Sequence, residues 1–274
     1  MQKFHRVGFI GAGNMAISIM TGMLKNGWPA ANISASDPFE PGRERASKLG
    51  IRTSAENLEI ARDSEVIVLA VKPQQLSAVC EELADCCQQH QPLIVSIAAG
   101  IGTGSLSNWL GAGVPIIRCM PNTPALVGLG ASVLFAAEGV DGAHRSTAQF
   151  LLECAGTVDW VEDEELMHAV TAVSGSGPAY FFLILEAIRD VGEKMGLNAE
   201  LANRLAIQTA AGAAAMAAGD VDLVELRRQV TSPGGTTERA IAAFEGGGLR
   251  QLVEQAMNDC AARARELDAL SAAD

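Results

Sequence analysis

The apolar positions of this chain form short continuous runs, separated by longer helix-like stretches, from Arg6 to about Val161. Runs such as Val66–Val71 are apolar at every position, which indicates strands covered on both faces, because a sheet with one face in water would alternate polar and apolar residues. Strands that alternate with helices predict an α/β fold, a doubly wound, mostly parallel sheet with helices on both faces. The predicted strands are Val7–Ile10, Ile33–Ser36, Val66–Val71, Leu93–Ala98, Ile116–Met120 and Ser132–Phe135.

The alternation stops after Glu162, and the rest of the sequence shows only helical periodicity. We therefore predict two domains, an α/β domain over residues 1–162 and an all-α domain over residues 163–274, which suits a chain of 274 residues. The predicted helices of the second domain are Glu164–Val173, Pro178–Met195, Ala199–Ala218, Leu223–Val230, Thr237–Phe244 and Leu249–Leu270.

The stretch Ala199–Ala218 carries small or apolar residues around most of its helical circumference. A helix of this kind is usually buried, and in so small a domain a second copy of the chain is a natural partner. We predict a homodimer through the helical domain. The alternative is a monomeric bundle with this helix at its centre.

Composition and charge exclude several partners. The net charge of -12 is wrong for a protein that neutralises phosphate backbones with Lys and Arg, so we expect no nucleic acid. The longest apolar stretches, such as Pro92–Ala99 and Tyr180–Leu185, are shorter than the roughly 20 residues that cross a bilayer. Met1–Ile10 shows no charged-then-apolar signal pattern. We expect a cytoplasmic protein with no membrane partner.

Two clusters that could suggest metal chemistry have simpler explanations. The six cysteines include no CxxC pair and none lies at metal-ligand spacing from a histidine, which favours buried thiols. The acidic residues between Asp159 and Glu165 directly precede a predicted helix, where carboxylates stabilise the helix N-terminus. The sequence therefore predicts no metal site.

A glycine-rich turn opens the chain. The sequence VGFIGAGNMA carries the pattern G-x-G-x-x-A between the first predicted strand and a helix. Gly11 permits the tight turn, Gly13 lets the backbone approach a pyrophosphate, and Ala16 lets the helix pack close to the strand. The helix N-terminus offers free N–H groups to the phosphates. This arrangement predicts a Rossmann-type dinucleotide site.

The residues after the second predicted strand leave the choice of dinucleotide open. Asp37 lies where this fold meets the adenosine ribose, and a carboxylate there favours a free 2′-hydroxyl and hence NADH. However, Ser34 and Ser36 could donate to a 2′-phosphate, and basic residues follow at Arg43, Arg45 and Lys48. The predicted cofactor is NADPH or NADH.

Three more strand ends should reach the cofactor or substrate, because ligands of such sheets bind beyond the carboxyl ends of the strands. They are the segments Ala70–Pro73, Ser96–Gly100 and Met120–Pro124. For the first two, the alternative is a plain turn between strand and helix that is punctuated by Pro or Gly.

A second glycine-rich turn, Thr231–Glu238, lies between two predicted helices. Gly234 and Gly235 leave backbone N–H groups uncovered, and the hydroxyls of Ser232, Thr236 and Thr237 add donors at a helix N-terminus. Such a turn can bind an anion. It can equally be an ordinary capped turn.

Six motifs together decide between these alternatives. They are VGFIGAGNMA, AVKP at Ala70, SIAAG at Ser96, RCMPNTPALV at Arg118, SGSGPAYFF at Ser174 and VTSPGGTT at Val230. In this order the chain resembles the pyrroline-5-carboxylate reductases over nearly its full length. The resemblance implies hydride transfer from NADPH or NADH to the C=N bond of 1-pyrroline-5-carboxylate, giving L-proline. It also implies an interlocked homodimer whose helical domain builds the active site, and assembly to a decamer of five dimers.

The resemblance also implies the site residues. Thr237 is the predicted catalytic residue, with its hydroxyl reaching the ring nitrogen of the substrate. Substrate binding is predicted for Ser232, Gly234, Gly235, Thr236, Thr237, Asn122 and Asp220. Cofactor binding is predicted for Ile10, Gly11, Ala12, Gly13, Asn14, Met15, Ser36, Asp37, Asn57, Ala70, Val71, Lys72, Pro73, Ser96, Ile97, Ala98 and Ala99.

Two other functions remain alternatives. A β-hydroxyacid-dehydrogenase-like oxidoreductase shares the layout of the two domains, but that class resembles a pattern with a catalytic lysine, and here the helix from Pro178 has no lysine before Lys194. A dinucleotide-sensing dimer without catalysis would bind the cofactor and leave it unoxidised.

Overall fold

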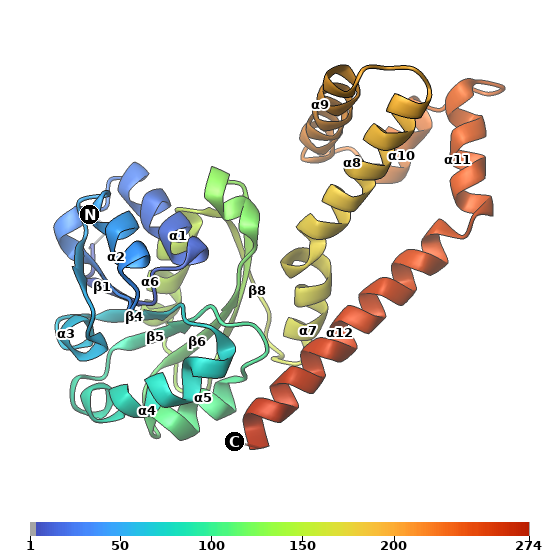
Figure 1. The fold of residues 1–274 in the computed structure, drawn as a ribbon. Coiled ribbons are helices and arrows are strands. Elements are labelled where there is room, and N and C mark those ends of the chain that lie inside the picture. The colour runs from blue at the N-terminus through green and yellow to red at the C-terminus, as the bar shows by residue number, and fades with distance from the viewer. Residues whose placement is uncertain (1–3, 274) are drawn as a thin grey trace. The chain divides into compact units, whose positions relative to one another are not determined.

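The computed structural model describes residues 4–273, and within them one eight-stranded sheet has the order β3-β2-β1-β4-β5-β6-β7-β8. Neighbouring strands are parallel except β6 and β7, which are antiparallel. Helices cover both faces of this sheet (Figure 1), which confirms the predicted doubly wound α/β architecture. The strands are β1 (Val7–Ile10), β2 (Ile33–Ser36), β3 (Arg52–Ser54), β4 (Val66–Leu69), β5 (Leu93–Ser96), β6 (Ile116–Met120), β7 (Gly130–Ala136) and β8 (Gly156–Trp160).

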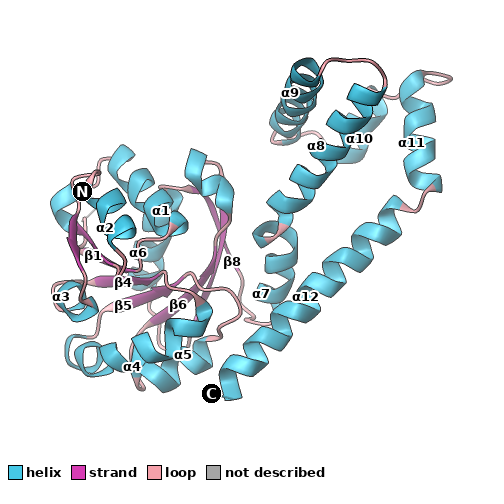
Figure 2. Ribbon diagram, in the orientation of Figure 1, coloured by secondary structure: helices cyan, strands magenta, loops and turns pink. Residues whose placement is uncertain are grey.

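Helices connect the strands and form every described element after β8 (Figure 2). Those of the sheet region are α1 (Asn14–Lys25), η1 (Ala30–Asn32), α2 (Glu40–Ser47), α3 (Asn57–Ala61), α4 (Pro73–His90), α5 (Thr103–Leu110), η2 (Thr123–Val127) and α6 (Gly142–Glu153). After β8 come α7 (Leu166–Val170), the π-helical turn η3 (Thr171–Gly175), α8 (Gly177–Lys194), α9 (Ala199–Ala217), α10 (Leu223–Gln229), α11 (Thr236–Gly246) and α12 (Leu249–Ala273). The change from a sheet to helices is confirmed.

Successive residues of the central strands face opposite sides of the sheet, and both sides are apolar. In β4, Val66 and Val68 belong to the core under α1 and α6, whereas Ile67 and Leu69 belong to the core under α4 and α5. All four side chains are buried. This double burial explains the uninterrupted apolar run in the sequence.

Two strands were not predicted from the sequence. β3 is three residues long and polar, with the sequence Arg-Thr-Ser at one edge of the sheet. β8 lies at the opposite edge and alternates between half-buried and exposed residues. Edge strands bury one face at most, so they lack the continuous apolar run that identified the central strands.

The chain forms two compact units, Met1–Ser176 together with Cys260–Asp274, and Gly177–Asp259. The last strand ends at Trp160, close to the domain boundary predicted between residues 162 and 163. The first compact unit nevertheless includes α7, η3 and the C-terminal part of α12. The boundaries of the compact units thus differ from the point at which the secondary structure changes from strands to helices.

The second unit carries many large apolar side chains on its surface. On α8, for example, the side chains of Phe181, Phe182 and Leu183 are each about two-thirds exposed. The segment Leu166–Lys194 is long and apolar enough to cross a membrane by length and composition, and only 17% of its most apolar window is buried. The sequence analysis missed this segment because it considered uninterrupted apolar runs only. An exposed apolar face of this extent is typical of a surface that another subunit covers.

Candidate active site

The turn between β1 and α1 requires glycine at its first position. Gly11 has φ +98°, and a Cβ at this residue would lie 2.7 Å from the carbonyl oxygen of Ala70. The N–H of Gly11 donates to the carbonyl oxygen of Ser36 at 2.8 Å. The turn is therefore closed against the ends of both neighbouring strands, β2 and β4, and only a residue without a side chain fits there.

The start of α1 is open in the way that a pyrophosphate site needs. Its N-cap residue, Gly13, has no side chain to cap the helix, and no atom lies within 4 Å of the position that a Cβ would take. The first N–H groups of the helix consequently point into free space, with the partial positive charge of the helix end behind them. This fits the phosphates of a dinucleotide.

Asp37 has a second role that the sequence did not reveal. One carboxylate oxygen accepts the N–H of Ala12 at 2.9 Å, and the other accepts the N–H of Phe39 at 2.9 Å. The carboxylate thus holds the glycine-rich turn in place while keeping its charge at the end of β2. Of the basic residues nearby, Arg45 donates to Asn14 and to the carbonyl of Ala12 at 2.7 and 2.8 Å.

Ser36 and Asn57, two of the predicted cofactor residues, are hydrogen-bonded to each other. The buried Ser36 hydroxyl donates to the side-chain oxygen of Asn57 at 2.8 Å, and the amide nitrogen of Asn57 donates to Glu82 on α4 at 2.8 Å. The chain therefore fixes the orientation of the Asn57 amide beside the end of β2.

The structure brings the predicted cofactor residues to the same side of the sheet, where the parallel strands have their carboxyl ends. They follow the carboxyl ends of β1 to β5, which run parallel to one another and therefore all end on that side. The strand pairing continues into the connecting segments, since Ala70 N–H donates to Ile10 and Ile97 N–H donates to Leu69. Beside them, the hydroxyl of Ser96 is buried and has no hydrogen-bond partner among the described residues.

Asn122 lies in the same unit, after β6, and is almost fully buried. Its amide nitrogen donates to the carbonyl of Ser174 at 3.1 Å, and its side-chain oxygen accepts the N–H of Ala131 at 2.9 Å. Both polar atoms of this predicted substrate residue are therefore bonded to backbone groups of η3 and β7.

The other predicted substrate residues belong to the second unit. The turn from Ser232 to Thr237 connects α10 and α11, and Asp220 lies in the connection between α9 and α10. Gly234 has φ +72°, and its N–H donates to Glu238 at 2.7 Å.

The hydroxyls of this turn are available to a ligand. Among residues 4–273, those of Ser232, Thr236 and Thr237 have no protein partner, and Gly235 leaves the start of α11 without a side-chain cap. The turn therefore presents uncommitted hydroxyls and N–H groups, as an anion site requires.

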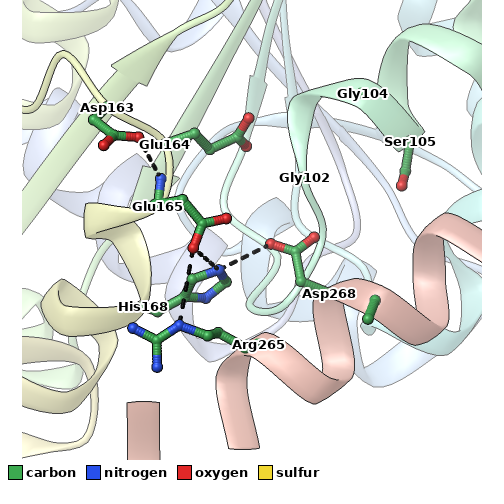
Figure 3. A pocket seen from close by; sticks show the side chains of 10 residues that line it. Gly102, Gly104, Ser105, Asp163, Glu164, Glu165, His168, Arg265 and Asp268 are labelled. Carbon is green, nitrogen blue, oxygen red and sulfur yellow. Dashed lines mark hydrogen bonds and ion pairs between the residues drawn. The ribbon is translucent and has the colours of Figure 1, made fainter. Parts of the chain in front are cut away.

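A cavity of about 420 Å³ in the first unit is lined by none of the predicted residues. Figure 3 shows three segments that are distant in the sequence around it, the β5–α5 loop, the start of α7 and the end of α12. Acidic, basic and imidazole side chains gather there. Its members are Gly102, Gly104, Ser105, Asp163, Glu164, Glu165, His168, Arg265, Asp268 and Ala269.

The acidic cluster caps its own helix in part, since Asp163 accepts the N–H of Glu165 at 3.0 Å, but Glu164 departs from that prediction. Its carboxylate accepts the N–H and the hydroxyl of Thr103 at 2.8 and 2.6 Å, so it caps α5 instead. It also pairs with the buried Arg118 of β6 at 2.9 Å. The signal for this pair in the sequence is the arginine inside the otherwise apolar stretch Ile116–Met120. A charge in such a position needs a partner from elsewhere in the chain.

Comparisons with known proteins agree over the whole chain. Residues 164–267 match the family model described as pyrroline-5-carboxylate reductase dimerisation, and residues 6–100 match the one described as NADP oxidoreductase coenzyme F420-dependent. A pyrroline-5-carboxylate reductase of Pseudomonas aeruginosa is 52% identical, with 96% of each chain covered. That of Haemophilus influenzae is 44% identical, with 96% of this chain and 98% of the relative covered.

The chain belongs to the pyrroline-5-carboxylate reductase family. The solved reductase of Coxiella burnetii has a TM-score of 0.92 and 42% identity, and the alignment covers 97% of this chain and 99% of that one. The Plasmodium falciparum pyrroline carboxylate reductase, solved with NADP bound, has a TM-score of 0.87 and 27% identity and covers 98% and 100% of the two chains. Family membership replaces the β-hydroxyacid-dehydrogenase-like alternative.

Proposed function

We propose that this protein reduces the C=N bond of 1-pyrroline-5-carboxylate to give L-proline, with NADPH or NADH as hydride donor. The observation that carries the proposal is the glycine-rich turn at the strand edge, closed by Gly11 and open at Gly13, in a chain that is 52% identical to a pyrroline-5-carboxylate reductase. The reaction is the last step of proline biosynthesis.

The chemistry makes modest demands on the side chains. A cyclic imine is readily protonated to an iminium ion, which accepts hydride without a covalent intermediate. The reduced nicotinamide supplies that hydride when it is bound. The main task of the protein is to hold the imine carbon in place, and such positioning can contribute roughly 7–11 kcal/mol to lowering the barrier.

We assign the substrate to the turn between α10 and α11. The free hydroxyls of Ser232 and Thr236 and the N–H groups at Gly235 suit the substrate carboxylate, and the hydroxyl of Thr237 suits the ring nitrogen. One charge-assisted hydrogen bond to the carboxylate contributes only about 1.5–3 kcal/mol. Orientation by the whole turn therefore outweighs any single contact. Asp220 is assigned to the same site, and Asn122 contributes by fixing η3 and β7.

We assign the dinucleotide to the strand edge of the first unit. The open N-terminus of α1 would hold the pyrophosphate, and Ser36, Asp37 and Asn57 would meet the adenosine ribose. The segments 70–73 and 96–99 complete the edge. Within residues 4–273 no group of three or more His, Cys, Asp or Glu side chains could hold a metal ion, and the proposed mechanism requires none.

The protein is a homo-oligomer, and we propose a dimer that forms through the helical region and assembles further into a decamer. The exposed apolar side chains of α8 support a subunit contact, because water would otherwise cover them at a high cost in free energy. The same contact accounts for the long apolar segment Leu166–Lys194, which lies entirely within the matched dimerisation region. We propose a cytoplasmic location. Light scattering on a size-exclusion column would measure the assembly.

The decisive experiment follows the absorbance of NADPH and of NADH when pyrroline-5-carboxylate is added to the purified protein. Oxidation of either cofactor with formation of proline supports the proposal. Binding of a cofactor without oxidation would instead identify a dinucleotide-sensing dimer.

A further inference from the structure

The loop between β5 and α5 is held by side chains that come from the far end of the chain. The one hydroxyl hydrogen of Ser271 is shared between the carbonyl of Gly100, at 3.1 Å, and that of Leu267 in its own helix, at 2.9 Å, and the hydroxyl of Ser105 donates to the carbonyl of Ser271 at 3.3 Å. Residues 100–105, the end of this loop and the first turn of α5, directly follow the segment 96–99 that we assign to the dinucleotide. The residues of α12 that anchor this loop therefore hold a segment that adjoins the assigned cofactor segment in the sequence.

The two glycines of the loop let α12 approach closely. A Cβ at Gly100, which has φ +71°, would lie 2.9 Å from the Cβ of Leu267. A Cβ at Gly102 would lie 2.9 Å from a carboxylate oxygen of Asp268. A side chain at Gly100 would push the helix away, and one at Gly102 would displace the carboxylate of Asp268, so the loop fits closely against one turn of α12.

Ion pairs also hold the loop and α12 together. Nη1 of Arg118, whose side chain is 4% exposed, lies 3.0 Å from Asp268 and 2.9 Å from Glu164. Glu164 in turn accepts both donors of Thr103, at the end of the loop. A buried guanidinium needs its carboxylates, and here they come from the two segments that enclose the loop. His168 lies next to this group, with Nε2 3.6 Å from Asp268 (Figure 3).

We propose that Asp268 is a positioning residue for the dinucleotide site. Through Arg118 and the α12 turn it holds residues 100–105, and so keeps the segment 96–99 in the conformation that binds the cofactor. The inference rests on the proposed assignment of 96–99 to the cofactor. Asp268 lies just beyond the residues matched by the dimerisation family, which end at 267.

The test compares Asp268→Asn with Glu266→Gln in the full-length protein. Asp268→Asn keeps the shape but loses the charge, while Glu164 still pairs with Arg118. We expect KM for NADPH or NADH to rise about 3- to 10-fold, because part of a charge-assisted hydrogen bond is lost. Both kcat and the KM for the imino acid should stay within about twofold of the wild-type values. Glu266 is exposed on the same helix and pairs only locally with Arg263, so Glu266→Gln should leave all constants unchanged.

Two further variants keep the test decisive. Ser271→Ala, which removes the bond to the Gly100 carbonyl, should change the constants in the same direction, and it replaces Asp268→Asn if that variant does not fold. Asp268→Glu should restore part of the affinity. A dinucleotide titration followed by fluorescence gives Kd without turnover, so the inference can be judged even if the proposed reaction fails. Cofactor KM and Kd unchanged in Asp268→Asn and Ser271→Ala, or KM for both substrates raised equally, would overturn it.

Discussion

Asn122 donates its side-chain N–H to the carbonyl oxygen of Ser174, 52 residues later in the chain, at 3.1 Å. Because its oxygen also accepts the N–H of Ala131, this one side chain joins the β6–η2 connection to η3 and to β7. A residue in this position affects the site through the backbone that it holds.

Asn122→Ala should therefore destabilise the protein by about 2–6 kcal/mol, since two partly buried backbone groups lose their partners at about 1–3 kcal/mol each. Urea unfolding measures this loss. Asn122→Asp should also destabilise, because a carboxylate would face the Ser174 carbonyl. Unchanged stability with a raised KM for the imino acid would instead show that Asn122 contacts the substrate directly.

Thr237→Ala should slow turnover by roughly 10- to 100-fold, the kinetic equivalent of one buried hydrogen bond. Thr237→Ser keeps the hydroxyl and should retain most of the rate. Thr231→Ala is a suitable control, because that hydroxyl donates to the carbonyl of Arg227 within the chain. Wild-type kinetics in Thr237→Ala would remove this hydroxyl from the mechanism.

Asp37→Asn should raise the ratio of kcat/KM for NADPH to that for NADH by about 10-fold, because one negative charge near a 2′-phosphate is removed. The amide oxygen can still accept the N–H of Ala12 and hold the glycine-rich turn, whereas the amide nitrogen cannot accept the N–H of Phe39. Asp37→Ala also loses this bond and should weaken the binding of both dinucleotides. An unaltered ratio in Asp37→Asn would mean that the carboxylate holds the turn in place but does not discriminate between NADPH and NADH.

The buried thiols predict a loss of stability at alkaline pH. Burial raises the pKa of Cys80, Cys87 and Cys119 from 9.0 to about 12, and that of Cys154 to about 11. Between pH 9 and the raised pKa values, the unfolded chain has released thiol protons that the folded chain retains. The contribution of these thiols to stability is therefore fully present below about pH 9 and falls as the pH rises. Each ionising thiol adds a slope of about 1.4 kcal/mol per pH unit.

Urea unfolding at several pH values above about 8 measures this slope. Cys119→Ala should make it shallower. Cys260→Ala, at a half-buried position, is the control and should leave the slope unchanged. Equal slopes in the wild type and in Cys119→Ala would contradict the assignment to this thiol.

Gly22→Ala should destabilise the protein although alanine favours helices. A Cβ at Gly22 of α1 would overlap with the carbonyl oxygen of Cys154. We expect a cost of about 1–3 kcal/mol from the forced displacement of α1. Gly104→Ala, in α5 with no atom within 4 Å of its Cβ position, should be neutral or stabilise by about 0.4–1 kcal/mol. A thermal melt compares the two variants.

The central strands and the long helices could be predicted from the sequence because their burial leaves a direct pattern. Val66–Val71 reads as a strand because both faces of β4 are covered, although the strand itself ends at Leu69. β3 and β8 were missed since edge strands lack that pattern. The glycine-rich turn could be found because the backbone at Gly11 tolerates no other residue.

Contacts between distant segments could not be predicted in this way. No local pattern around Glu164 indicates that it caps α5 or pairs with Arg118, and nothing near Asp37 indicates the bond to Ala12. The proposal that the turn between α10 and α11 binds the substrate comes only from the order of the six motifs, because a glycine and hydroxyl turn between helices also fits an ordinary cap.

The first compact unit takes its final piece from residues 260 onward, after the entire second unit. During synthesis, the nascent sheet must therefore wait for roughly another 5–18 s of translation beyond Ser176 before Asp268 can reach Arg118, given about 5–20 residues per second. Until then the guanidinium has only Glu164 as a partner, and the loop after β5 lacks its support. The support that α12 gives to this loop is thus added only after the whole second unit has been translated.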